Sequence, residues 1–133
     1  MLASLCLLTR LVMTRFAVCA LLGFALGTSA ALAQTKISNG MLTGPNGMTL
    51  YTFDKDAAGS GKSACTGPCE KLWPPFTANA SDKAAGDYSL IARDDGNKQW
   101  AYKGKPLYFW SKDQKSGDMT GDGFNKIWHV AKP

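Results

Sequence analysis

The chain has few of the residues that catalytic and metal sites most often use. It holds one histidine, His129, and four cysteines among 133 residues, and no G-x-S-x-G sequence marks a serine nucleophile. Nothing singles out the two placed carboxylates that a glycosidase needs. These shortages predict a protein that is not an enzyme, and a hydrolase that uses aspartates of its loops is the alternative.

Runs of one charge are also missing. The formal net charge is +5, but the lysines are mostly single and stand beside glycine or aspartate. No basic stripe with interleaved aromatics occurs, and such a stripe is the usual footprint of nucleic-acid binding. The sequence therefore predicts no nucleic-acid partner, and the lysines are interpreted as solvated strand faces and turns.

Long apolar runs are confined to the start of the chain. Arg10 and Arg15 precede an apolar run over residues 16–26, and small residues follow as far as Ala33. This order predicts a signal peptide over residues 1–33 that is cleaved after Ala33. The run is shorter than the ~20 apolar residues of a membrane-spanning helix. A retained anchor is the alternative, and after cleavage no stable membrane span is expected.

Two other features of this segment bear on processing. Cys19 follows Val18, whereas a bacterial lipidation site requires a small residue there, so the sequence argues against lipid attachment at Cys19. Translation from Met13 would give a signal of ordinary length. Either start predicts export, to the periplasm or to the outside of the cell.

What the chain does have is a ten-residue sequence that occurs twice. Residues 47–56 read GMTLYTFDKD and residues 104–113 read GKPLYFWSKD. A Lys-Leu-Trp sequence ending at Trp73 follows the first copy, and Lys-Ile-Trp ending at Trp128 follows the second. A repeat of this kind is one supersecondary unit used twice. We therefore expect one domain over 34–133, with repeats over 36–76 and 88–130 related by a pseudo-two-fold axis.

The local patterns predict short strands and tight turns. Alternating apolar residues and turn residues place strands over 36–42, 48–53, 88–93, 98–102, 105–110 and 127–130, with turns over 44–47, 94–97 and 103–104. One short helix is expected over 67–72, capped by Thr66, with Pro68 in its first turn and Pro74 ending it. The fold class is therefore all-β: a small antiparallel sandwich or barrel from two tandem repeats, with one short helical turn.

Cys65 and Cys69 are the two cysteines that remain after signal cleavage. An oxidising compartment favours a disulfide between them, acting as a staple before Trp73. The alternative is a copper or redox site formed by Cys65, Cys69 and His129, because soft thiolates suit Cu(I). That set resembles the ligands of Sco-type copper chaperones, whose thioredoxin-like α/β fold differs from the all-β pattern here.

The aspartates of the second loop allow two interpretations. Asp113, Asp118 and Asp122 lie among glycines, and hard oxygen ligands on a glycine-rich loop suit calcium. Their spacing does not match a calcium-binding loop, so we interpret them as turn formers. The repeated Asp56 and Asp113 each follow a strand, where an aspartate accepts backbone N–H groups of the next loop.

The repeated aromatic positions are Tyr51, Phe53, Tyr108 and Trp110. Large rings dominate small cores, which predicts that these four are buried. If they instead share one exposed face, they form a flat surface suited to a sugar, a peptide or a porphyrin.

The two sequences Tyr51-x-Phe53-x-x-Asp56 and Tyr108-x-Trp110-x-x-Asp113 resemble a bacterial family called the secreted repeat of unknown function. Its members are described as lipoproteins with a Yx(FWY)xxD motif. The C-x-G-x-C-x3-W-P-P sequence over 65–75 and the closing G-D-G and W-H-V sequences over 121–130 also fit this family. The resemblance implies export to the periplasm or envelope, tandem repeats and no established activity. We therefore expect a non-enzymatic binding or structural module without a cofactor, whose partner is an envelope component or a small ligand.

Overall fold

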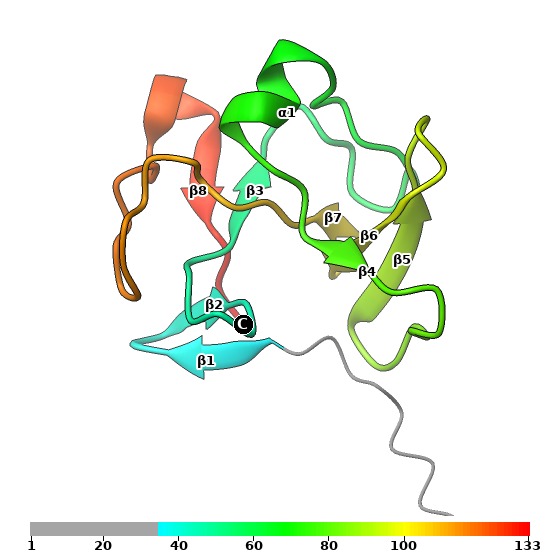
Figure 1. The fold of residues 1–133 in the computed structure, drawn as a ribbon, viewed down its shortest axis with the longest axis horizontal. Helices are drawn as coiled ribbons and strands as arrows, with labels where there is room; N and C mark the ends of the chain where they lie inside the picture. The colour runs from blue at the N-terminus through cyan, green and yellow to red at the C-terminus, as the bar shows by residue number, and fades with distance from the viewer. Residues whose placement is uncertain (1–34) are drawn as a thin grey trace, which may run out of the picture.

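The computed structural model describes residues 35–133 (Figure 1). The predicted signal peptide over 1–33 and Cys19 lie outside the described residues. Within residues 35–133 the fold is mostly β, with antiparallel pairing and one short α-helix, so the predicted fold class is confirmed. In that same range no helix is long and apolar enough to cross a membrane.

The strands form three small antiparallel sheets, and isolated pairings such as Tyr51 with Tyr108 connect them. One sheet pairs β1 (Lys36–Ser38) with β2 (Met41–Thr43), and a second pairs β3 (Tyr51–Phe53) with β8 (Trp128–Val130). The third has the order β4 (Thr77–Ala78), β6 (Lys98–Tyr102), β5 (Tyr88–Ala92), with β7 (Lys105–Pro106) also paired to β6. Helix α1 (Pro68–Leu72) and the 3-10 helix η1 (Phe124–Lys126) lie above these sheets in Figure 1.

The single strand predicted over 36–42 is wrong, because the chain reverses within it. Asn39 and Gly40 have φ angles of 50° and 74°, and Ser38 pairs with Met41 across this turn. Asn-Gly is the pair that a two-residue hairpin turn with positive φ favours. Asn39-Gly40 is therefore a turn signal in the sequence. The prediction placed the first reversal of the chain at the later turn over 44–47 instead.

That later turn also forms. The N–H of Gly47 donates to the carbonyl of Gly44 at 2.9 Å, and the N–H of Gly44 donates to Met48 at 2.9 Å. Thr43 then lies opposite Thr49 in an isolated antiparallel pairing. The segment over 36–53 is consequently a three-part meander with two turns where one was predicted.

Three further predictions differ from the structure in detail. The predicted strands over 48–53 and 105–110 shorten to β3 and β7, because neighbouring residues bond to different segments of the chain. The segment over 77–87, which lies between the two predicted repeats and was assigned no strand, begins with β4, which pairs with β6. Helix α1 has Pro68 in its first turn as expected, but Gly67 precedes it at a φ of 60° and no side chain caps it, so the Thr66 cap is wrong.

The two repeats exchange their last strands. The segment after Trp73 belongs to the first repeat, yet the N–H of Phe76 donates to Leu107 at 2.9 Å and the N–H of Trp100 donates to Phe76 at 2.9 Å. Both partners are residues of the second repeat. The end of repeat one is therefore built into the sheet of repeat two.

The end of the second repeat is likewise built into the first repeat. The N–H of Ala131 donates to Leu50 at 2.8 Å, and the N–H of Leu42 donates to Ala131 at 2.9 Å. Strand β8 continues this pairing along β3, from Tyr51 opposite Val130 to Phe53 opposite Trp128. Figure 1 shows β8, near the end of the chain, lying beside β3. This reciprocal exchange is the predicted pseudo-two-fold relationship, and it makes each repeat incomplete without the other.

Neighbouring residues of each motif copy bury their side chains in two separate apolar clusters. Leu50 and Leu107 are fully buried in one cluster, and Tyr51 and Tyr108 are fully buried in the other. Side chains of successive strand residues point to opposite faces, so each motif strand lies between the two cores. The motif strands are therefore the central elements of the fold.

Candidate functional site

The side chains of the repeated motif converge where the two repeats meet. Tyr51 and Tyr108 are fully buried, and Phe53 and Trp110 expose 7% and 4% of their surface. All four belong to one apolar cluster. The motif rings are thus core residues, as predicted from ring size, and they do not form the exposed aromatic surface that was the alternative.

The tryptophans that end the two repeats stack on each other. The ring centroids of Trp73 and Trp128 are 3.8 Å apart and the planes differ by 3°. Trp73 also contacts Trp110 at 4.0 Å and meets Tyr51 edge-on at 5.3 Å. Aromatic pairs of this kind contribute about 0.5–1.5 kcal/mol each beyond the burial of their area. This stack therefore joins the two repeats through the centre of the core.

The motif tyrosines and aspartates form two reciprocal hydrogen bonds. The hydroxyl of Tyr51 donates to Oδ2 of Asp113 at 2.6 Å, and the hydroxyl of Tyr108 donates to Oδ2 of Asp56 at 2.5 Å. Each tyrosine thus binds the aspartate of the other copy of the motif. Hydrogen bonds to an ionised acceptor are roughly twice as strong as neutral ones, and both of these are buried.

The second oxygen of each aspartate closes the loop that follows its own strand. Oδ1 of Asp56 accepts the N–H of Ala64 at 2.6 Å. Oδ1 of Asp113 accepts the N–H of Thr120 at 3.0 Å and the hydroxyl of Thr120 at 2.6 Å. The prediction that these aspartates accept backbone N–H groups of the next loop is confirmed. Their bonds to the tyrosines were not predicted.

Burial sets the protonation of these groups. Burial, then the hydrogen bond to the partner aspartate, raises the pKa of Tyr51 and of Tyr108 well above the usual range. Burial also raises the pKa of Asp56, against the opposing effects of the Ala64 N–H, the Tyr108 hydroxyl and the charge of Arg93. Both phenols therefore stay protonated and act as hydrogen-bond donors to the aspartates.

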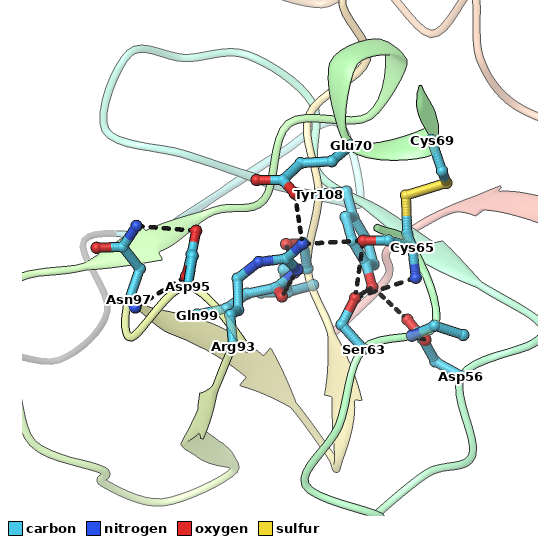
Figure 2. A network of polar contacts seen from close by, with 12 residues as sticks. Asp56, Ser63, Cys65, Cys69, Glu70, Arg93, Asp95, Asn97, Gln99 and Tyr108 are labelled. Atoms are coloured by element: carbon cyan, nitrogen blue, oxygen red, sulfur yellow. Dashed lines mark hydrogen bonds and ion pairs between the residues drawn. A yellow bond between two sulfur atoms is a disulfide. The ribbon is translucent and has the colours of Figure 1, made fainter. Parts of the chain in front are cut away.

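Arg93 organises a polar network beside Tyr108, shown in Figure 2. Its Nη1 donates to Oε1 of Gln99 at 2.7 Å, and its Nη2 donates to the carbonyl of Cys65 at 2.9 Å. Nη2 also lies 3.1 Å from Oε2 of Glu70, on α1. A buried charge is costly unless it is paired and hydrogen-bonded. The guanidinium satisfies this requirement by connecting α1, the loop before it and strand β6.

Gln99 extends this network within the second repeat, from Arg93 to Leu107. It is fully buried, and its Nε2 donates to the carbonyl of Leu107 at 2.7 Å. The sequence reasoning did not find Arg93 or Gln99 as network residues. The available signal was that Gln99 shares a strand face with Ala101, whose small apolar side chain is typical of a buried face. Burial of a glutamine there requires partners such as these.

The predicted disulfide between Cys65 and Cys69 is present. Cys65 is fully buried, and Cys69 lies half-buried on α1. The N–H of Cys65 donates to Oγ of Ser63 at 3.2 Å, and that hydroxyl lies 2.6 Å from the hydroxyl of Tyr108. Figure 2 shows the disulfide and the network side by side. The disulfide therefore fixes the loop that carries the partners of Tyr108.

His129 lies apart from this network. It is exposed on β8, and its Nε2 is 2.8 Å from Oδ2 of Asp54. Among residues 35–133 no three or more side chains of histidine, cysteine, aspartate or glutamate gather as a metal site requires. The structure therefore does not bring Cys65, Cys69 and His129 together as the predicted copper ligands.

The aspartates of the second loop have separate structural partners. Oδ2 of Asp118 accepts the N–H groups of Gln114 and Lys115 at 2.9 and 3.2 Å, and Oδ1 of Asp122 accepts the N–H of Val130 at 3.0 Å. Asp113 lies in the core with Tyr51. These contacts agree with aspartates that stabilise turns. Each of the three carboxylates accepts hydrogen bonds from a different set of partners.

The geometry defines a class of small domain in which two copies of one unit complete each other through Tyr–Asp pairs and exchanged strands. A family described as a secreted repeat of unknown function matches the chain twice, over residues 36–77 and 89–132. The chain belongs to this family, and the resemblance inferred from the motif is confirmed. Neither the curated proteins nor the solved structures gave a match to the chain.

Proposed function

We propose that this protein is exported to the periplasm or the cell surface and works there as a non-enzymatic binding or structural module. Its partner is an envelope component or a small ligand, and it uses neither nucleic acid nor a bound cofactor. The family is described as secreted, which agrees with export. The signal-like order of residues 1–33 supports the same route.

The pair of reciprocal Tyr–Asp bonds carries the proposal. The two hydrogen bonds occupy the polar groups of the motif, with Tyr51 on Asp113 and Tyr108 on Asp56. An active-site carboxylate must reach a substrate, whereas Asp56 and Asp113 expose 5% and 8% of their surface. The most distinctive residues of the sequence therefore serve to assemble the domain. This leaves the outer surface for recognition.

Export is tested by expressing the full chain in a bacterial host and measuring the mass of the periplasmic product by mass spectrometry. A mature chain that begins at Gln34 is expected, because the small residues before it suit signal peptidase. A product that stays in the membrane fraction at full mass would mean a retained anchor.

The non-enzymatic assignment is tested by a broad hydrolase screen of the purified protein and of two variants. Asp118→Asn removes a half-buried loop carboxylate, and Asp113→Asn removes a buried one. We expect no turnover by any of the three proteins. Turnover by the parent that Asp118→Asn abolishes, while the variant keeps its fold by circular dichroism, would contradict the proposal.

The copper or redox alternative is tested separately. Copper binding by Cys65 and Cys69 requires the disulfide to open, because the thiolate is the metal ligand. Titration of the reduced protein with Cu(I) against a competing chelator distinguishes the two functions. Stoichiometric binding that Cys69→Ser and His129→Ala each weaken would support the copper alternative. Binding that is unchanged by His129→Ala would exclude His129 from any such site.

A further inference from the structure

A basic groove lies between the exchanged strand and the second repeat. Its volume is about 340 Å³, within the range of about 300–1,000 Å³ that small-molecule sites occupy. It lies between β3, the turn that joins β6 to β7, and the segment that ends β8. Its lining residues are Thr52, Tyr102, Lys103, Lys105, His129, Val130, Ala131 and Lys132.

The groove combines an apolar base with a cationic rim. Val130 and Ala131 are buried beneath it, exposing 7% and 3% of their surface. Lys103, Lys105 and Lys132 are exposed around it, and none of its lining residues is acidic. Like charges held near one another repel, and a bound anion relieves that repulsion. The groove is therefore chemically matched to a ligand with an apolar body and a negative group.

The rim is held by ordered backbone. Lys103 has a φ of 48° in the tight turn after β6, and its N–H donates to the carbonyl of Asp87 at 2.8 Å. Its ammonium lies 5.2 Å from the centre of the Tyr102 ring, within the range of a cation–π contact. A site whose parts are already positioned loses less entropy when a ligand binds.

His129 also lines the groove and adds a polar side chain to it. Its Nε2 is bonded to Asp54 at 2.8 Å. This pairing neutralises part of the charge beside His129, so the three lysines are the cationic groups of the groove that no acidic lining residue offsets. An anionic group is therefore expected at the lysines, with the body of the ligand along Tyr102 and Val130.

The pseudo-two-fold axis provides an internal comparison. A second hollow, of about 80 Å³, lies at the related position of the other repeat, and Pro45, Phe76 and Thr77 line it. Counting from the motif copies, Pro45 corresponds to Tyr102; counting from Trp73 and Trp128, Phe76 and Thr77 correspond to Ala131 and Lys132.

The related hollow lacks the features of the groove. Its lining contains no lysine and includes Asp82. The positions that match Lys103 and Lys105 are Asn46 and Met48. Symmetry of the fold therefore does not account for the lysines, which mark one of two otherwise related hollows.

We propose that this groove binds a small organic anion: a compact aromatic or sugar-like body that carries one carboxylate or phosphate. The anionic group lies among Lys103, Lys105 and Lys132, and the body packs against Tyr102 and Val130. The assignment rests on the proposed function as a binding module and names its ligand class. The anion is either a free molecule or the headgroup of an anionic lipid.

The test is an NMR titration of the disulfide-bonded, exported protein with four probes. The probes are benzoate, phenyl phosphate, neutral benzyl alcohol and inorganic phosphate. Benzoate and phenyl phosphate are expected to shift the amide signals of the groove residues and to bind at least tenfold more tightly than benzyl alcohol. Added salt should weaken both, because exposed charges are screened. Equal binding of benzyl alcohol, or shifts confined to other residues, would overturn the proposal.

A matched pair of variants separates the groove from general charge. The triple variant K103Q/K105Q/K132Q should lose at least tenfold in affinity for phenyl phosphate. The control K36Q/K83Q/K115Q removes three exposed lysines that do not line the groove, and it should stay within twofold of the parent. An equal loss in both variants would mean diffuse electrostatic attraction, which contradicts the site.

Two further measurements identify the source of the anion and separate the two proposals. Co-sedimentation with vesicles of anionic lipid that the groove variant abolishes identifies a headgroup, whereas benzoate binding without co-sedimentation identifies a free molecule. Failure of every probe overturns the groove and leaves a structural module possible. Conversion of a bound probe into a product contradicts the non-enzymatic assignment and leaves the groove in place.

Discussion

Tyr51 and Tyr108 pair with each other at the pseudo-two-fold axis. The N–H of Tyr51 donates to the carbonyl of Tyr108 at 2.8 Å, and the N–H of Tyr108 donates back to Tyr51 at 3.0 Å. From this shared point each side chain crosses to the aspartate of the opposite motif. The two motif tyrosines thus provide the backbone pairing, the core packing and the side-chain hydrogen bonds between the repeats.

The Tyr–Asp pairs predict an unusual pattern of energetic coupling. Tyr51→Phe should destabilise the fold by about 1–3 kcal/mol, because it leaves a buried carboxylate oxygen of Asp113 without its donor. In a double-mutant cycle, Tyr51→Phe and Asp113→Asn should therefore be strongly coupled. The measurement is the free energy of unfolding by urea denaturation of the four proteins.

The matched control uses residues of one motif copy. Tyr51→Phe and Asp56→Asn change two residues that share a motif but no hydrogen bond. Their effects on the free energy of unfolding should therefore be closer to additive. Tyr102→Phe supplies a second control, because its ring is half-buried and its hydroxyl lies outside the Tyr–Asp network. Stronger coupling within a motif than between motifs would show that the observed pairing is not the one in solution.

The buried phenols predict that stability falls in alkaline solution. The pKa of both Tyr51 and Tyr108 is raised in the folded state, so the unfolded chain loses these protons first as the pH rises. The free energy of unfolding should therefore be constant with respect to these groups below about pH 9 and fall above about pH 10, by about 1.4 kcal/mol per pH unit for each phenol.

Denaturant unfolding at pH 8 and pH 11 measures this loss. The variant Tyr51→Phe should lose less stability between the two pH values than the parent loses, since one buried phenol is gone. An identical pH dependence in the two proteins would assign the effect to other groups.

The exchanged strands predict that neither repeat folds alone. A fragment over 35–82 and a fragment over 83–133 should each lack cooperative unfolding, because each has given its last strand to the other. Mixing them should restore the circular dichroism of the whole domain. A cut after Asp82 interrupts the loop between β4 and β5 and leaves the exchanged segments intact.

Sedimentation of the separate fragments provides the check on this result. A fragment that unfolds cooperatively as a monomer would contradict the exchange. A fragment that forms a symmetric dimer would support it, because a second copy can occupy the place of the missing repeat.

The disulfide should contribute modestly to stability. Closing so short a loop between Cys65 and Cys69 gives about 2 kcal/mol by the chain-entropy formula. The double variant Cys65→Ser/Cys69→Ser should therefore fold, with a lower urea midpoint and an unchanged dependence on denaturant. A variant that fails to fold would show that the buried Cys65 contributes through its packing as well.

Gly121 should tolerate no side chain. A Cβ there would lie 2.7 Å from the ring of Trp73 and 2.9 Å from the ring of Trp110, and overpacking of this kind costs about 1–3 kcal/mol. Gly121→Ala should therefore lower the melting temperature. The double variant with Trp73→Phe should show less than the sum of the two effects, because the smaller ring leaves space for the methyl group.

Some of the fold could be predicted because its signals are local. The β5–β6 hairpin, its turn over 94–97 and the short helix beginning at Pro68 were all found from turn residues and alternation. The Asn39-Gly40 turn was equally local but was missed, since a second turn signal over 44–47 competed with it. The length of β3 was overestimated because the partner of each residue changes along the strand.

The candidate site also has some features that the sequence predicted and others that it did not. Burial of Tyr51 and Trp110 and the loop-closing role of Asp56 followed from ring size and from position after a strand. Arg93 and Gln99 were not identified, because the network that requires them also contains Cys65 and Glu70 of the other repeat, which only the tertiary fold brings to Arg93. Cys65, Cys69 and His129 do not form one cluster among the described residues, since spacing in the sequence does not report distance in space.

The sequence by itself determined that two copies of one unit are present, that each copy has a tryptophan near its end, and that Cys65 and Cys69 suit a disulfide. Only the tertiary structure decided that Tyr51 binds Asp113 and not Asp56, that the last strands are exchanged, and that lysines gather at one of two related hollows. The physical reason is that composition and periodicity record which groups must be buried or paired. Which copy supplies each partner depends on long-range packing, which two equal motifs leave undetermined.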